Sequence, residues 1–223
     1  MTEFSPQALP LKLKAVLSQA DLERSDFAFS KGAVVVSQGD ANDAIYYLQT
    51  GTVKLSATSA AGKVAVLAIL GPGDFFGESD LLGPQDRNAS VIAVTDIEVM
   101  RIKKSALVAG LHKNVEFAEF FIDYLLHRMR RAQSQQISQL YYSSEKQLAC
   151  ALLLMSDFSD AATLEVVLPN IGQETLAAMI GTTRARVSHF MTIFRKRGYI
   201  TYGDEIRVHR SLLKVFDDHA DAA

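Results

Sequence analysis

The chain has 223 residues, a length that suits one large domain or two ordinary ones. Its 48% hydrophobic and 22% charged residues are typical of a soluble globular protein and exclude collagen, a low-complexity polymer and a wholly disordered chain. The formal net charge of -2 averages over an uneven distribution, because residues 182–197 include five basic residues and no acidic one.

No segment is apolar for long enough to cross a bilayer. The longest uninterrupted apolar runs, 64–70 and 148–155, reach seven and eight residues, whereas a membrane helix needs roughly 18. The first six residues show neither the basic nor the apolar region of a signal peptide. We therefore expect a cytoplasmic protein with no membrane partner.

Cysteine and histidine usage argues against a metal centre. The single cysteine, Cys150, excludes an intramolecular disulfide and four-cysteine zinc or iron–sulfur sites. It lies in the apolar run 148–155 and is interpreted as a core residue, with a reactive thiol as the alternative. The five histidines show no pair at metal-ligand spacing. No metal site is predicted.

Short β-type runs separated by glycines occupy residues 27–102. Many short strands with regular turns predict a sandwich or barrel of jelly-roll type. A β-sandwich without a ligand fits the same pattern. The predicted strands cover 33–36, 44–48, 52–55, 63–70, 90–94 and 97–102.

A long amphipathic helix is predicted over residues 114–142, which contain no Gly or Pro. A helix of about 29 residues extends roughly 43 Å, more than one small domain can cover. Part of its stripe therefore needs another partner, most simply a second copy of the chain. The alternative is a helix packed only on its own barrel. The predicted dimer stripe, which recurs at three- and four-residue steps, is Ile122, Leu126, Met129, Gln133, Ile137 and Leu140.

After a further helix over 145–158 and a polar loop, the sequence predicts two short helices joined by a tight turn. Gly181 can end the first in a left-handed conformation, and Thr182 or Thr183 can cap the second. Residues 199–209 then predict a β-hairpin wing. The buried side of the second helix is predicted to be Val187, Phe190, Met191 and Phe194.

The opposite face of the second helix predicts a DNA-reading surface. In a helix-turn-helix the N-terminal end of this helix enters the major groove, where arginine can bond guanine in a bidentate manner. We expect double-stranded operator DNA to be contacted by Gln173, Thr183, Arg184, Arg186, Ser188, His189 and Arg195.

In this order, the barrel, the long helix and the winged helix-turn-helix are similar to the Crp–Fnr family of bacterial transcription regulators. The resemblance runs from about Phe27 to Leu213. It implies an α+β fold with an effector-sensing barrel over 1–112, a dimerisation helix over 113–142 and a DNA-binding domain over 143–223. It also implies a homodimer that acts with RNA polymerase.

Residues 74–90, Asp-Phe-Phe-Gly-Glu-Ser-Asp-Leu-Leu-Gly-Pro-Gln-Asp-Arg-Asn-Ala-Ser, are similar to the family's phosphate-binding cassette. In cyclic-nucleotide binders of this kind, the arginine matching Arg87 pairs with the cyclic phosphate. The glutamate matching Glu78 accepts from the ribose hydroxyl. Polar residues of the long helix also reach the base, partly across the dimer. The resemblance thus implies an effector site, possibly for cyclic AMP or another cyclic nucleotide, formed by Gly77, Glu78, Ser79, Arg87, Asn88, Ala89, Gln133 and Ser134.

The cassette departs from the family pattern in two places. Asn88 replaces a Ser or Thr that usually supports the phosphate, and Ser79-Asp80 replaces an apolar and then a small residue. If Asp80 faced the pocket, its charge would oppose an anion. Two alternatives therefore remain open. The barrel binds a cyclic nucleotide or dinucleotide, or it binds another effector or none and Glu78 and Arg87 form an internal ion pair.

Two further features bear on what is sensed and read. A haem-bound gas, held through His112 or His127, is an alternative signal. The family pattern places an acidic residue after the first arginine of the second helix, but this chain has Ala185. Alanine cannot accept from cytosine N4, so the best-known operator sequence is not assumed.

Two other classes of protein fit the sequence less well. A regulatory subunit that does not bind DNA leaves the C-terminal reader unexplained. An enzyme is disfavoured because the chain has no nucleophile motif, Walker loop, metal cluster or dinucleotide fingerprint.

Overall fold

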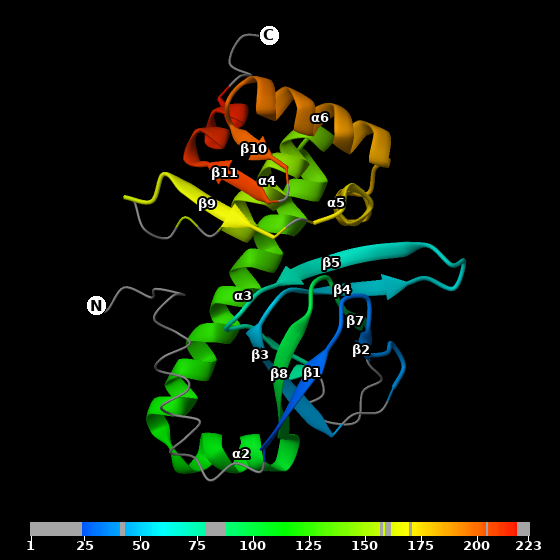
Figure 1. The fold of residues 1–223 in the computed structure, drawn as a ribbon. Helices are drawn as coiled ribbons and strands as arrows, with labels where there is room; N and C mark the ends of the chain where they lie inside the picture. Colours follow the sequence, from blue (N-terminus) through cyan, green and yellow to red (C-terminus); the bar gives the residue numbers. More distant parts are fainter. Residues whose placement is uncertain are drawn as a thin grey trace. The chain divides into compact units, whose positions relative to one another are not determined.

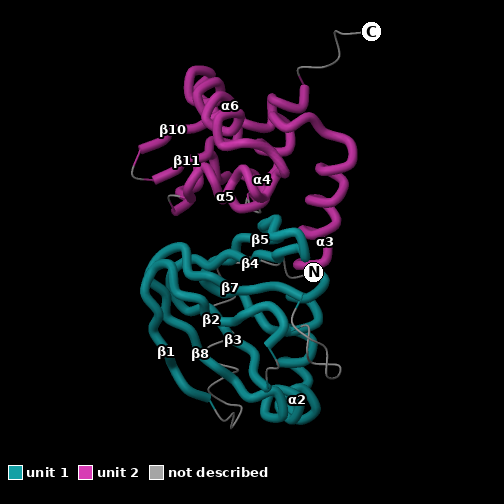
Figure 2. Tube along the Cα trace, turned by 90° about the vertical axis from the view of Figure 1, so that its right-hand side faces the viewer, with its two compact units in different colours: residues 1–126 teal, residues 127–223 magenta. Residues whose placement is uncertain are grey.

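A computed structural model of the chain describes residues 24–40, 43–78, 88–156, 158, 162–169, 171–203 and 205–217. The chain forms two compact units, residues 1–126 and 127–223, which divide within the long helix (Figures 1 and 2). The three-part division expected from the sequence stays a prediction. In the described ranges, no helix has both the length and the apolar character that a membrane span requires.

Unit 1 is built on two antiparallel four-stranded sheets that share one core (Figure 1). The first sheet has the order β1 (Arg24–Phe29), β8 (Ile97–Lys103), β3 (Ala44–Thr50) and β6 (Phe75–Phe76). The second has the order β2 (Val34–Val36), β7 (Ser90–Ala93), β4 (Val53–Thr58) and β5 (Val64–Leu70). All six predicted strands are present, and β1 and β6 are additional.

Strand β8 of the first sheet is buried on both faces. On β8, Ile97 and Val99 pack between the sheets, while Met100 and Ile102 pack on helices α2 (Lys104–Lys113) and α3 (Val115–Tyr141). Successive side chains of a strand point to opposite faces, which explains why this strand is apolar at most positions. The sequence did not predict α2, whose Leu107 joins the helix-covered core.

Unit 2 contains the rest of α3 and the helices α4 (Ser144–Ser156), α5 (Gln173–Ile180) and α6 (Arg184–Lys196). The predicted helix over 145–158 therefore ends at Ser156. The predicted two-stranded wing is present as part of a three-stranded sheet. The order of its strands is β10 (Ile200–Tyr202), β11 (Ile206–His209) and β9 (Glu165–Leu168), and β9 was not predicted. A 3-10 helix, η2 (Arg210–Phe216), comes last.

The turn between α5 and α6 has the geometry of a helix-turn-helix. Gly181 has a φ of 66°, so this residue ends α5 in the left-handed conformation that glycine tolerates. Thr183, rather than Thr182, caps α6 by accepting a hydrogen bond from the Arg186 N–H. Leu176 of α5 is buried together with Val187 and Phe194 of α6.

Candidate nucleic-acid interface and effector site

The polar face of α6 is exposed along its length. Val187 and Met191 are buried, whereas Ser188 and His189 are exposed. The basic residues of this helix and its C-terminal end are exposed as well: Arg184, Arg186, Arg195, Lys196 and Arg197. Five cations on an exposed helical face, with no acidic residue on α6, form a surface suited to the phosphates and base edges of DNA.

Two contacts orient the arginines at the N-terminal end of α6. Arg184 Nε lies 3.1 Å from Glu174 Oε1 on α5, in an exposed ion pair that adds little stability. The Arg186 guanidinium lies over the Phe190 ring, 5.8 Å from its centroid. The prediction that Phe190 is buried was wrong in degree, because this residue is only half-buried.

Sequence reasoning missed Glu174 as a partner of Arg184, one of the predicted DNA-reading residues. It lies in the first turn of α5, directly after Gln173, which is half-buried as the first residue of that helix. Only the fold of the turn brings Glu174 to Arg184, ten positions along the chain.

The wing carries its own charge compensation. Arg207 on β11 pairs with Glu165 on β9 at 3.2 Å and with Glu205 at 3.3 Å. His209 Nδ1 lies 3.2 Å from the second oxygen of Glu165. The carboxylates offset the positive charge of Arg207, so α6 is the part of this unit best suited to attract DNA.

The described ends of the cassette belong to different sheets. Gly77, with a φ of 86°, and the partly buried Glu78 follow β6, which pairs with β3. Exposed Asn88 and buried Ala89 precede β7, which pairs with β2 and β4.

The middle of the cassette, with Ser79, Asp80 and Arg87, lies outside the described residues. The predicted roles of Ser79 and Arg87, and the alternative Glu78–Arg87 pair, therefore stay predictions.

A tyrosine of α3 holds the strand that leads into the cassette. The buried Tyr124 hydroxyl accepts a hydrogen bond from the Phe75 N–H at 2.8 Å. It lies 3.2 Å from the Phe75 carbonyl oxygen and 3.5 Å from an Asp74 carboxylate oxygen, both of which can accept its proton. This contact could not be predicted from sequence, because Tyr124 and Phe75 are 49 positions apart along the chain.

The neighbouring Tyr47 side chain is buried as well. Burial, with a smaller contribution from the negative charge of Asp74, raises the pKa of Tyr47 to about 12. A hydrogen bond in such surroundings is costly to break without a replacement.

The predicted dimer stripe is exposed in the single chain. Ile122 and Leu140 are 56% and 69% exposed, and the other members, Leu126, Met129, Gln133 and Ile137, are exposed as well. Phe117 and Phe121 lie on another face of α3 and are buried in the core of unit 1. One face of α3 thus packs within its own chain and the other does not.

The two helix residues expected to reach an effector lie on different faces of α3. Gln133 is exposed within the dimer stripe, and Ser134 lines a pocket of unit 2. Their predicted role at the effector site stays a prediction. His112 is exposed at the end of α2. His127 lines the same pocket as Ser134.

Comparisons with known proteins identify both parts of the chain. The model of the cyclic nucleotide-binding domain matches residues 27–114, and that of the Crp-like helix-turn-helix domain matches residues 146–211. The cyclic AMP receptor protein of Thermus thermophilus is 29% identical over 188 residues, which are 83% of this chain and 85% of that protein.

A second relative and a solved structure agree. The CRP-like cAMP-activated global transcriptional regulator of Mycobacterium tuberculosis is 26% identical over 175 residues, 77% of this chain and 78% of that protein. The structure of FixK2 from Bradyrhizobium japonicum, 23% identical, superimposes with a TM-score of 0.74 and covers 91% of this chain and 100% of that one. This protein is a member of the Crp–Fnr family of transcription regulators, which are DNA-binding proteins and not enzymes.

Proposed function

We propose that this chain is a homodimeric transcription regulator that reads a pseudo-palindromic operator and is controlled by a cyclic nucleotide bound at the cassette. The observation that carries the proposal is the exposed, oriented pair Arg184 and Arg186 at the N-terminal end of α6. This role implies RNA polymerase as a further partner. The chain is expected to act in the cytoplasm.

The DNA-reading role divides the basic residues into two groups. Arg184 and Arg186 begin α6, at the end that contacts base edges in helix-turn-helix proteins. Arg195, Lys196 and Arg197 lie at the other end, where contacts to phosphates supply affinity without sequence preference. Gln173 begins α5 and is assigned to the phosphate-contacting group.

Dimerisation is supported by the exposed apolar stripe of α3. Five large apolar side chains exposed at helical spacing on one element form a patch that soluble monomers rarely leave uncovered. Pairing of the stripe with its copy in a second chain buries it symmetrically. A two-fold dimer also places two α6 helices against two half-sites, one helical turn of DNA or about 34 Å apart.

The effector assignment rests on the match of residues 27–114 to the cyclic nucleotide-binding domain, and on relatives that are named for cyclic AMP. Glu78, the residue matched to the ribose-binding glutamate, lies at the described edge of the cassette and is partly buried. Asn88 and the Ser79-Asp80 pair favour a second candidate, in which the barrel takes another effector or none.

The experiment is a selection from randomised DNA duplexes by the purified full chain, with no nucleotide and with cyclic AMP, cyclic GMP or cyclic di-GMP. We expect an enriched pseudo-palindrome whose half-sites lie about 10 base pairs apart, and tighter binding with one nucleotide. Failure to enrich any sequence would contradict the DNA-reading role. An enriched site whose affinity no nucleotide changes would support the second effector candidate.

A further inference from the structure

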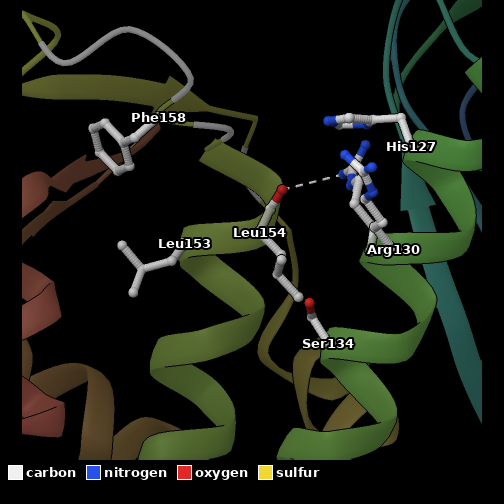
Figure 3. Close-up of a pocket in the computed structure, with 7 residues that line it drawn as sticks. His127, Arg130, Ser134, Leu153, Leu154 and Phe158 are labelled. Carbon is white, nitrogen blue, oxygen red and sulfur yellow. Dashed lines mark hydrogen bonds between the residues drawn. The ribbon is translucent and has the colours of Figure 1, made fainter. Parts of the chain in front are cut away.

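A pocket of about 280 Å³ lies in unit 2, between α3 and the C-terminal end of α4 (Figure 3). Its volume is close to the lower end of the range for small-molecule sites, roughly 300–1,000 Å³, and suits one ring with a short substituent. The lining residues are His127, Arg130, Arg131, Ser134, Leu153, Leu154 and Phe158.

The pocket has one basic and one apolar wall. His127, Arg130 and Ser134 come from α3, together with Arg131, and their three- and four-residue spacing places them on one face of that helix. Leu153 of α4 and Phe158 lie across from them in Figure 3. This basic face differs from the dimer stripe. Leu126, Met129 and Gln133 of the stripe each precede a pocket residue by one position, which is a turn of about 100° around the helix.

The guanidinium of Arg131 is fixed by the end of α4. Its Nη2 donates to the Leu154 carbonyl oxygen at 3.2 Å. The last four carbonyls of a helix lack partners within it, so this bond caps α4 and leaves the other N–H donors of Arg131 for a ligand. A fixed guanidinium loses less freedom on binding than a mobile one.

The positive charge of the pocket has little compensation in the described part of the chain. No described acidic side chain forms an ion pair with Arg130 or Arg131, and the end of α4 contributes only about half a negative charge. The Arg210 guanidinium lies 5.9 Å from the Phe158 ring centroid. Asp157 and Asp160, next to Phe158 in the sequence, lie outside the described residues and are included in the test.

We propose that this pocket binds a small organic carboxylate with an aryl or branched apolar body, at a site separate from the cassette. The two guanidinium groups match a carboxylate in charge and geometry, and the Ser134 hydroxyl can donate to the same group. Phe158 and the leucines cover the apolar body. This proposal does not depend on the effector of the barrel.

The site lies one helix away from the DNA reader. Helix α4 packs against both α5 and α6, so a ligand that binds Arg131 and packs on the leucines at the end of α4 can change the free energy of states in which these helices move.

The test is an NMR titration of the full chain, with labelled leucine methyl groups, using benzoate as the probe and benzamide as its uncharged counterpart. We expect benzoate to shift the Leu153 and Leu154 methyl signals, and benzamide to bind about tenfold more weakly or worse, because it lacks the charge. Arg130→Gln should weaken benzoate binding about tenfold. The matched control Lys214→Gln removes an exposed charge of the same unit outside the pocket and should change nothing.

Several outcomes would overturn the proposal. Equal benzoate affinity in wild type and Arg130→Gln would show that the basic wall is not the binding group. Shifts by benzamide or inorganic phosphate at the same concentrations as by benzoate would contradict the ligand class. Binding of benzoate only to the Asp157→Asn, Asp160→Asn variant would mean that the chain's own carboxylates occupy the pocket.

Discussion

The two units place their chemistry on the polypeptide in different ways. In unit 2 the DNA-reading residues occupy one stretch, 173–197, and two short contacts, from Glu174 and Phe190, orient the arginines. In unit 1 the two ends of the cassette leave different sheets, and Tyr124 of α3 holds β6 beside one of them. The proposed DNA-reading surface is thus built locally, whereas the proposed effector site depends on contacts between segments distant in the sequence.

The largest expected effect, on dimerisation and operator binding, comes from changes in α3, which contributes residues to both units. Replacing Leu126 and Met129 with aspartate would place unpaired charges within the proposed interface. We expect a monomer by light scattering and operator binding weakened by a factor of about 1,000 or more, since one half-site supplies only part of the affinity. Glu116→Gln, an exposed change on another face of α3, is the control. A dimer that survives the double change would remove α3 as the interface.

The next largest effect concerns the cassette alone. Arg87→Gln should abolish nucleotide binding, because it removes the cation expected opposite the cyclic phosphate. Arg101→Gln is the matched control, since Arg101 pairs with Asp43 elsewhere in unit 1. Calorimetry with the nucleotide that acts on wild type decides between them. Retained affinity in Arg87→Gln would place the effector outside the cassette.

Tyr124→Phe tests whether the effector unit depends on a contact between distant segments. Loss of the hydroxyl leaves the buried Phe75 N–H without its partner, which should lower the free energy of unfolding of unit 1 by about 1–3 kcal/mol. Tyr46→Phe is the control, because in the described structure the Tyr46 ring stacks on Phe76 and its hydroxyl makes no hydrogen bond. Equal stability of both variants in urea would show that the Tyr124 contact is dispensable.

The smallest effect separates phosphate contacts from base contacts in unit 2. Arg195→Gln should reduce the slope of log affinity against log salt by about one unit and leave the preferred sequence unchanged. Lys113→Gln, exposed at the end of α2, should leave the slope as in wild type. A changed sequence preference in Arg195→Gln would move the base-reading surface toward the C-terminal end of α6.

Most strands and helices could be predicted because their signals are local. Glycines separate the strands of unit 1, and Gly181 with Thr183 defines the turn between α5 and α6. Strand β9 was missed although Glu165–Leu168 contains two adjacent valines, because the segment is short and its partner strand β11 follows almost 40 positions later. Helix α2 was missed because its weakly periodic apolar residues follow a strand without a turn signal.

The candidate sites show the same limit. Arg184 and Arg186 follow from the pattern of a single helix, so the sequence sufficed to nominate them. The partners Glu174 and Tyr124, and the meeting of Arg131 with Leu154, require the packing of one element on another. Such contacts between elements leave no periodic mark in a single sequence.

The most direct test of the account is a selection from randomised DNA with three proteins: wild type, Arg184→Ala and Arg186→Ala. Each arginine that bonds a base edge contributes about 1–3 kcal/mol of discrimination at one position. The account predicts that at least one variant loses preference at one position in each half-site and keeps the rest of the wild-type sequence. An unchanged preferred sequence in both variants would contradict the claim that the N-terminal end of α6 reads the operator.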